Sequence, residues 1–189
     1  MALTCEATEL PGVRLFTPEV FGDPRGFFME TYRADKYGRH GVPAALVQSN
    51  FSRSARGILR GLHYQLRHPQ GKLVAALSGE IFDVAVDVRR GSPTFGRWVG
   101  HRLSGENHRQ LWIPAGYAHG FCVLSETADV LYHCTDFYRP EDERGLLWND
   151  PALAIAWPQA GAPLLSARDA RHPLLADLPA EDLPRYAGD

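Results

Sequence analysis

The sequence predicts an all-β domain of the sandwich or jelly-roll type with only short helices. The chain has 189 residues, of which 18 are Gly and 14 are Pro, and these turn-forming residues are spread along its whole length. Such spacing is expected where turns join many short strands. Between the turns, several segments read as short strands. A chain of this length can bury one sizeable core, so we expect a single domain over residues 1–189.

The clearest strand is predicted at residues 81–88. Its apolar residues at 82, 84, 86 and 88 fall on one face, and Asp83 and Asp87 fall on the other. This alternation predicts a half-buried strand. Further short strands are expected at residues 73–77, 111–113 and 120–124.

Helices are expected at only two places. Residues 30–39 and 167–178 have the charge spacing and the length of short helices. A short C-terminal tail is expected from about residue 176, and its final residues, rich in Pro and acids, are expected to pack loosely at the surface.

Composition excludes several classes of protein. A formal net charge of -2 gives no overall electrostatic case for binding nucleic acid or a membrane, so the positive partner of an anionic ligand must be local. No apolar run approaches the length of a membrane helix, and the first twenty residues lack a secretory signal, so a cytoplasmic protein is expected. Cys5, Cys122 and Cys134 lack CxxC spacing and are interpreted as free thiols.

An arginine and a histidine stand close together in the strand-like run Arg60-Gly-Leu-His63. A histidine lining a barrel interior can act as a general base. Taken alone, a core histidine that hydrogen-bonds a backbone carbonyl is the commoner case. Gly61 would let the backbone bend or another group approach closely.

Lys72 begins the next predicted strand, after Gln70-Gly. A lysine that points inward is costly unless it meets an anion or a developing negative charge, so Lys72 is a candidate for stabilising an enolate. The alternative is an edge lysine in water, which is commoner for an isolated lysine.

The run Pro114-Ala-Gly116-Tyr-Ala-His119 resembles the second metal motif of the cupin superfamily. The first cupin motif, His-x-His followed shortly by Glu, is missing, because His63 is followed by Tyr64-Gln65 and no glutamate comes before Glu80. Two histidines without further ligands make a poor divalent site. We therefore expect a cupin with neither metal nor cofactor.

Two further segments carry groups that can move or orient protons. Tyr132 and Tyr138 lie in a strand predicted at residues 129–138, where a phenol can serve as an acid, although Tyr132 fits equally well as an ordinary barrel residue. Asp169, in Leu165-Ser-Ala-Arg168-Asp169, can hold the tautomer of a histidine base such as His63, or can simply cap a helix.

Together these segments resemble the dTDP-4-dehydrorhamnose 3,5-epimerases, and the resemblance runs from about Gly12 to Leu175. It rests on many fixed spacings in one order. Besides the runs above it includes Phe21-Gly-Asp-Pro-Arg25-Gly-Phe-Phe-Met-Glu30, Gln48-Ser-Asn50-Phe-Ser, Asp83-Val-Ala-Val-Asp87, Gly91-Ser-Pro-Thr-Phe-Gly96 and Trp148-Asn-Asp150-Pro.

The resemblance implies a cupin-type jelly roll, usually a homodimer that exchanges its N-terminal strands, acting on a dTDP-linked 4-keto-6-deoxyhexose. It implies that His63, paired with Asp169, removes the proton beside the C4 ketone. Lys72 would stabilise the enolate, and Tyr132 would reprotonate the opposite face. Substrate contacts are implied for Arg25, Glu30, Gln48, Asn50, Arg60, His119, Tyr138, Glu143 and Arg168.

Two features stand apart from this pattern. The family more often has Lys where this chain has Arg168, which keeps the charge and changes the reach. Arg60 and His63 differ in strand parity, so an ideal strand would point them to opposite faces. Either Gly61 bends the run or the two residues serve different parts of the site.

Four other functions stay open. On the same scaffold, an enzyme could invert C3 alone or move the keto group between C3 and C4, because these reactions share an enolate or enediol. Tyr132 favours epimerisation, since inversion needs a second proton-transfer group. A metal-dependent cupin and a sugar-binding cupin without catalysis are the less favoured alternatives. Trp112, Trp148, Phe121 and Tyr138 are the aromatic candidates for stacking on the base.

Overall fold

The structure is a computed structural model, and it describes residues 1–159 and 161–188. Strands dominate this part of the chain. The first seven are β1 (Leu3–Ala7), β2 (Arg14–Pro18), β3 (Val20–Asp23), β4 (Gly26–Met29), β5 (Gln48–Ala55), β6 (Leu59–Gln65) and β7 (Lys72–Ser78). They are followed by β8 (Glu80–Asp87), β9 (Trp98–Ser104), β10 (Gln110–Ile113), β11 (Tyr117–Val123), β12 (Thr127–Cys134) and β13 (Glu143–Gly145).

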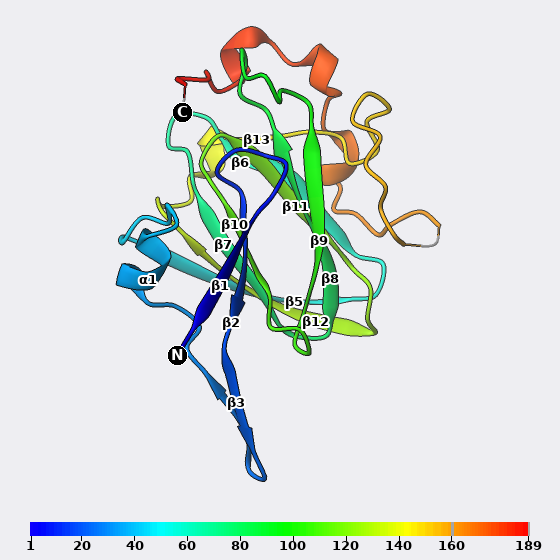
Figure 1. The fold of residues 1–189 in the computed structure, drawn as a ribbon. Helices are drawn as coiled ribbons and strands as arrows, with labels where there is room; N and C mark the ends of the chain where they lie inside the picture. Colours follow the sequence, from blue (N-terminus) through cyan, green and yellow to red (C-terminus); the bar gives the residue numbers. More distant parts are fainter. Residues whose placement is uncertain (160, 189) are drawn as a thin grey trace.

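The strands form two packed antiparallel sheets, which confirms the predicted all-β jelly roll (Figure 1). One sheet has the order β1-β2-β10-β7-β12-β5, and the other has the order β13-β6-β11-β8-β9. Chain neighbours are often not sheet neighbours, as expected when a folded-over ribbon of strands is divided between two sheets. The strands predicted at residues 73–77 and 111–113 fall within β7 and β10, whereas the one predicted at 120–124 starts three residues late and ends one residue beyond β11.

The main core fills the space between the sheets with apolar side chains from both, among them Val74, Leu111 and Val130 from one sheet and Ile81, Ala85 and Leu103 from the other. Tyr132 packs at the margin of this core. The space between the sheets is thus filled by apolar side chains up to Tyr132, which also lines the polar pocket described below.

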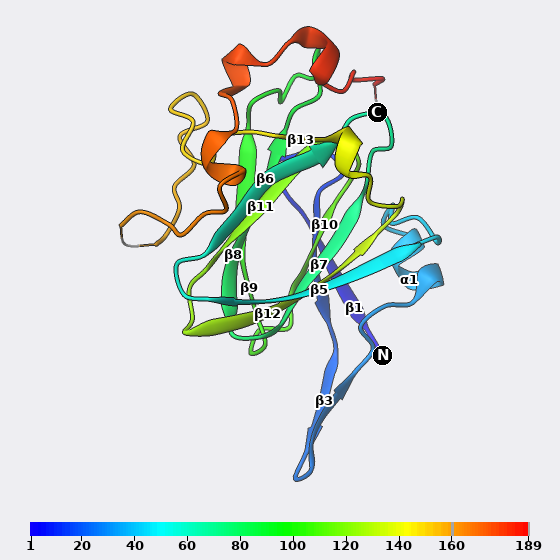
Figure 2. The same ribbon diagram turned by 180° about the vertical axis from the view of Figure 1, so that it is seen from behind.

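Strand β8 is buried on both faces, so the prediction of a half-buried strand is wrong. Val84, Val86 and Val88 are fully buried because C-terminal residues such as Leu153 and Leu175 cover the outer face of the five-stranded sheet (Figure 2). The two aspartates on the opposite face are also fully buried. Each is hydrogen-bonded, Asp87 to Arg89, Ser92 and Thr94, and Asp83 to His119.

The helices are shorter than predicted. Within residues 30–39 only α1 (Ala34–Gly38) is helical, and it packs through Tyr37 on the outer face of the six-stranded sheet. Instead of a helix at 167–178, the chain makes two 3₁₀ turns, η2 (Asp169–Arg171) and η3 (Leu175–Asp177), separated by Pro173. Proline lacks the N–H that a continuous helix needs. No helix in residues 1–159 and 161–188 is long and apolar enough to cross a membrane.

The C-terminal tail is tied to the domain, so the expectation of loose packing is wrong. Leu183 is buried against the five-stranded sheet, between the 3₁₀ turn η4 (Ala180–Asp182) and Pro184. The Tyr64 hydroxyl donates to the backbone carbonyl of Asp182, and the Asp182 carboxylate pairs with Arg144. A fourth 3₁₀ turn, η1 (Pro140–Asp142), precedes β13.

The hairpin β3–β4 projects away from both sheets (Figure 1). Its tip carries Arg25, whose side chain is 90% exposed and, among the residues that the structure describes, forms its ion pair with Asp23 of the same hairpin. Phe21, Phe27 and Phe28 are also exposed on it. A hairpin that displays three phenylalanines is poorly explained by the single chain.

Gly61 produces the irregularity at which β6 meets β11. The register between these strands shifts between His119 and Phe121, and Gly61 has a φ of 123°. A Cβ at this position would lie 2.5 Å from Gly120 Cα and 2.8 Å from the His119 carbonyl oxygen. Only glycine fits such a close approach of two backbones.

We therefore expect Gly61→Ala to destabilise the domain by about 3 kcal/mol, measured by urea unfolding, because two backbones must separate. Gly57→Ala is the control. Gly57 also has a positive φ, but a Cβ there meets nothing within 4 Å. It should lose only about 1 kcal/mol, the backbone term alone. Equal losses in the two variants would contradict the steric account.

Candidate active site

A polar pocket opens between the two sheets. It consists of two adjoining hollows of about 330 Å³ and 320 Å³, which share His63, Lys72, Tyr132, Tyr138 and Glu143 as lining residues. Strand β6 of the five-stranded sheet supplies His63, whereas β7 and β12 of the other sheet supply Lys72 and Tyr132. The two walls of the pocket therefore carry different chemistry.

His63 is bound to a buried carboxylate. Its Nε2 lies 2.7 Å from Asp169 Oδ1, although the two residues are 106 positions apart in the sequence. The backbone N–H of Asp169 donates to Ser166 Oγ, which fixes the start of η2. Burial acts to raise the pKa of Asp169, but the neighbouring imidazoles of His172 and His63 outweigh it and hold the pKa below its ordinary value. Asp169 is therefore a carboxylate that accepts a hydrogen bond from the Nε2–H of His63 and leaves Nδ1 without the proton.

Arg60 and His63 line the same hollow despite their opposite strand parity. The shifted register at Gly61 accounts for this, so the first of the two explanations offered by the sequence is the one observed. Arg60 is exposed at the rim and donates from Nε to Ser54 Oγ, while His63 lies deeper.

Lys72 points into the pocket without a counter-ion. No hydrogen bond or ion pair of the Lys72 ammonium is found within the described part of the chain, and Cys134, Glu143 and Asp83 are the acidic groups that act on it. Burial lowers the pKa of the Lys72 ammonium below its ordinary value, although Cys134, Glu143 and Asp83 act to raise it. A desolvated ammonium of this kind is well suited to meeting a developing oxyanion.

Tyr132 faces the pocket from β12. Its ring lies 6.5 Å from the His119 ring, centroid to centroid. Burial raises the pKa of the Tyr132 phenol above its ordinary value. At neutral pH the phenol is therefore protonated, which is the state of a proton donor.

A second histidine–aspartate pair lies beside the first. His119 Nε2 is 2.7 Å from Asp83 Oδ1, and both side chains are buried. His119 was identified from its motif, but Asp83 was interpreted only as the polar face of a half-buried strand. Asp83 alternates with Phe82 and Val84, so it had to point to the opposite face of β8, and this alternation was the signal that could have placed it inside the barrel.

The rim of the pocket is built by polar side chains from the remaining segments. Gln48 Nε2 donates to Asn50 Oδ1, and the backbone N–H of Tyr138 donates to Gln48 Oε1. Arg168 Nη1 forms an ion pair of 2.7 Å with Glu143 Oε1. These predicted contact residues are thus brought together with Arg60 and His119, and whether they touch substrate remains a prediction.

Arg25 and Glu30 are the two predicted contact residues that lie outside the pocket of the single chain. Arg25 is on the projecting hairpin, and Glu30 pairs with Lys36 Nζ at 2.6 Å. Neither lines the hollows that contain His63.

His172 was not identified from the sequence. Its Nε2 lies 3.6 Å from Asp169 Oδ1, and its ring meets the His63 ring edge-on at 5.4 Å. Within the described residues, His63, Asp169 and His172 are the one group of His, Cys, Asp or Glu side chains close enough to hold a metal ion. Asp169 already accepts from His63, so the expectation of a metal-free site stays a prediction, and metal analysis of the purified protein tests it.

The lowered pKa of Lys72 predicts how activity depends on pH. As the pH rises, Lys72 loses its charge earlier than an ordinary lysine, whereas Tyr132 keeps its proton longer than an ordinary tyrosine. kcat should therefore fall on the alkaline side with a midpoint below 10.5, the ordinary lysine value. In Lys72→Arg the arginine stays charged at alkaline pH, so the remaining activity should no longer fall on the alkaline side of the profile. A pH–rate profile measures both, and an unchanged limb in the variant would assign it to another group.

A jelly roll that gathers a histidine, a tyrosine and a lysine in one interior pocket is of the class of the cupin-type isomerases. A family model described as dTDP-4-dehydrorhamnose 3,5-epimerase matches residues 7–177. The chain belongs to this family, as the sequence resemblance indicated.

Individual relatives agree. A Pseudomonas aeruginosa protein named dTDP-4-dehydrorhamnose 3,5-epimerase is 62% identical, over 89% of this chain and 93% of its own. A solved structure of the Legionella pneumophila dTDP-6-deoxy-D-glucose-3,5-epimerase, in complex with dTDP-4-keto-L-rhamnose, is 52% identical with a TM-score of 0.96 and covers 99% of this chain and 100% of that one. A Streptomyces niveus protein named dTDP-4-dehydrorhamnose 3-epimerase is 44% identical, over 94% of this chain and 87% of its own.

Proposed function

We propose that this protein epimerises dTDP-4-dehydro-6-deoxy-D-glucose at C3 and C5 to give dTDP-4-dehydro-L-rhamnose. The observation that carries the proposal is the placement of His63 and Tyr132 on opposite walls of one pocket, with Lys72 on the same wall as Tyr132. Inversion of a carbon requires removal of its proton on one face and delivery of a proton on the other. His63 on one wall is the proposed base, and Tyr132 on the opposite wall is the proposed acid.

The proposed base is the neutral imidazole of His63. Since Asp169 accepts a hydrogen bond from Nε2–H and so holds the proton on that nitrogen, the lone pair of Nδ1 is available to take the proton from carbon. C3 and C5 both flank the C4 ketone, so one oxyanion stabiliser serves both steps. Lys72 supplies it, and the resulting enolate is then reprotonated by the Tyr132 phenol.

The proposed diphosphate site uses local positive charge, because the chain as a whole is slightly acidic. Arg60 and Arg168 stand at the rim on the His63 side. A guanidinium fork can bind two phosphate oxygens at once. Arg168 is now paired with Glu143, so phosphate would have to compete with that carboxylate or bind beside it.

We further propose a homodimer in the cytoplasm. The exposed phenylalanines of the β3–β4 hairpin would be covered by a second copy, as would the apolar hollow that Phe27 and Phe28 share with Leu77 and Leu131. In that arrangement Arg25 would lie near the pocket of the partner subunit, which explains why it has no role in the single chain. Light scattering of the wild type and of Phe27→Ser tests the assembly.

The stereochemistry of the product tests the reaction. The enzyme is incubated with dTDP-4-dehydro-6-deoxy-D-glucose, the ketone is reduced with borohydride, and the released sugars are identified. Inversion at both carbons gives L-configured 6-deoxy sugars, including L-rhamnose. Products of the D series changed only at C3 would replace the proposal with a C3-epimerase, and unchanged substrate would reject epimerisation of this sugar.

Tyr132→Phe should separate proton removal from inversion. His63 and Lys72 remain, so deuterium from solvent should still enter at carbon through His63, on the face from which the proton left. The inverted product should fall by about 10²-fold or more because the acid on the other face is gone. Proton NMR in deuterated water compares exchange with inversion. Equal loss of both would contradict the assignment of Tyr132 as the acid.

A further inference from the structure

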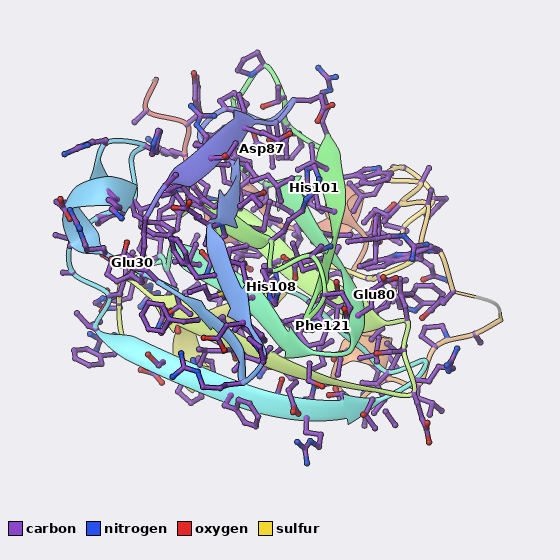
Figure 3. All side chains as sticks on the ribbon, turned by 60° about the horizontal axis from the view of Figure 1, so that its bottom comes forward. Glu30, Glu80, Asp87, His101, His108 and Phe121 are labelled. Carbon is purple, nitrogen blue, oxygen red and sulfur yellow. The ribbon has the colours of Figure 1, made fainter. Side chains whose placement is uncertain are left out.

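A row of three ionisable side chains crosses the five-stranded sheet from the pocket outwards. His119 lies on β11, Asp83 on β8 and His101 on β9. Asp83 is directly opposite His101 in the antiparallel register of β8 and β9, so the two side chains share a face. Asp83 also binds His119 at 2.7 Å. Figure 3 labels His101, the outer member of this row.

The outer half of this row contains two buried polar atoms without a partner. Asp83 Oδ2 and His101 Nε2 are both inaccessible to solvent and make no hydrogen bond. Buried polar atoms are nearly always satisfied, so each unsatisfied one requires an explanation. Here the two atoms are complementary, because a carboxylate oxygen accepts and an imidazole nitrogen can donate. One bridging water, or a small rotation of the His101 ring, would satisfy both.

The far end of the row approaches the surface. His101 is half-buried, and the charges that act on it besides Asp83 are Glu9, Arg109 and Glu6, which belong to the N-terminal segment and to the turn before β10. Burial lowers the pKa of His101, while Glu9 and Asp83 act to raise it. A neutral imidazole in this position can take a proton from the solvent side and release it inwards.

The proposed reaction needs such a route. Each inversion leaves His63 with an extra proton and Tyr132 as a phenolate, and inversion of both C3 and C5 repeats this within one turnover. Tyr132 must regain a proton each time while the substrate fills the opening of the pocket. The His119 ring is 6.5 Å from the Tyr132 ring, so the row begins beside the acid that must be reset.

We propose that His119, Asp83 and His101 form a proton relay that reprotonates Tyr132 from the β9 side of the sheet, with His101 as its outer member. The relay starts with a proton on Asp83 Oδ1 and with neutral His119 protonated on Nδ1. His119 Nδ1 gives its proton to the Tyr132 phenolate, His119 Nε2 takes the proton of Asp83 Oδ1, and Asp83 Oδ2 takes a proton from His101, directly or through one water. Rotation of the Asp83 carboxyl group and of the His119 ring then restores the starting arrangement. His101 then takes a proton from solvent or buffer, so that one proton enters for each one delivered. The inference rests on the proposed epimerisation.

The test compares His101→Gln with wild type and with His40→Gln, a control at an exposed histidine on the opposite side of the domain. The glutamine amide can still donate to Asp83 but cannot relay a proton. We expect kcat of His101→Gln to fall roughly tenfold with KM unchanged, and added imidazole to restore it in a saturable manner. Wild type and His40→Gln should not respond to imidazole.

Each other result counts against the relay. Wild-type kcat in His101→Gln would show that the side chain only fills space or donates a hydrogen bond, and a loss that imidazole does not restore would show a structural role. If His101→Gln does not fold, kcat of the wild type is measured in mixtures of H₂O and D₂O. A curved dependence is expected where several protons move, and a straight line would overturn the relay. A wild type without activity would instead reject the epimerisation itself.

Discussion

His63→Asn should abolish proton exchange at both C3 and C5. The reason is that one imidazole, oriented by Asp169, is the base for both carbons in the proposed mechanism. Loss of a positioned general base typically lowers the rate by about 10²–10⁴-fold. The measurement is kcat from a time course of the sugar signals, with circular dichroism to show that the variant is folded.

A companion variant tests the role of the carboxylate. Asp169→Asn places an amide donor next to Nε2 in one of its two orientations, which favours the tautomer with the proton on Nδ1, where the base needs its lone pair. The loss should approach that of His63→Asn, and the double variant should lose little more than either single variant. Exchange that survives at one carbon in His63→Asn would show that a second base, such as His119, serves that carbon.

Lys72→Met should lower kcat by about 10²–10³-fold, the usual effect of removing a preorganised oxyanion donor. Methionine keeps the length and the apolar part of the side chain, so packing in β7 is preserved. Binding of dTDP should be nearly unchanged, because the nucleotide contacts are expected at the arginines. Calorimetry with dTDP and steady-state kinetics measure the two quantities. A variant with normal kcat and weakened binding would make Lys72 a binding residue.

The sequence predicted the architecture because strand signals are local. Alternation at 81–88 and the turns rich in Gly and Pro are visible in a few residues each, and the all-β jelly roll followed from them. The burial of β8 was not predictable in this way, since it depends on Leu153 and Leu175, which fold over the sheet from far along the chain. The helix at 167–178 failed on Pro173, whose effect outweighs the charge pattern.

The sequence identified some residues of the site and missed others. His63, Lys72, Tyr132 and Asp169 were identified because the family resemblance assigned them roles, and the structure brings all four to one pocket. His172 had no motif to mark it.

Parity alone would have separated Arg60 from His63, and only the bulge at Gly61 reconciles them. Arg25 shows a different limit, because the site of one chain does not reach it.

In the proposed mechanism His63 is the base for both C3 and C5, the carbons beside the ketone. The most direct measurement is proton NMR of dTDP-4-dehydro-6-deoxy-D-glucose in deuterated water with the wild-type enzyme, following the C3 and C5 protons separately. If His63 is the base for both carbons, both signals disappear as deuterium enters. With His63→Asn, neither signal disappears faster than it does without enzyme. Exchange at C3 alone, or exchange at both carbons that persists without His63, would contradict it.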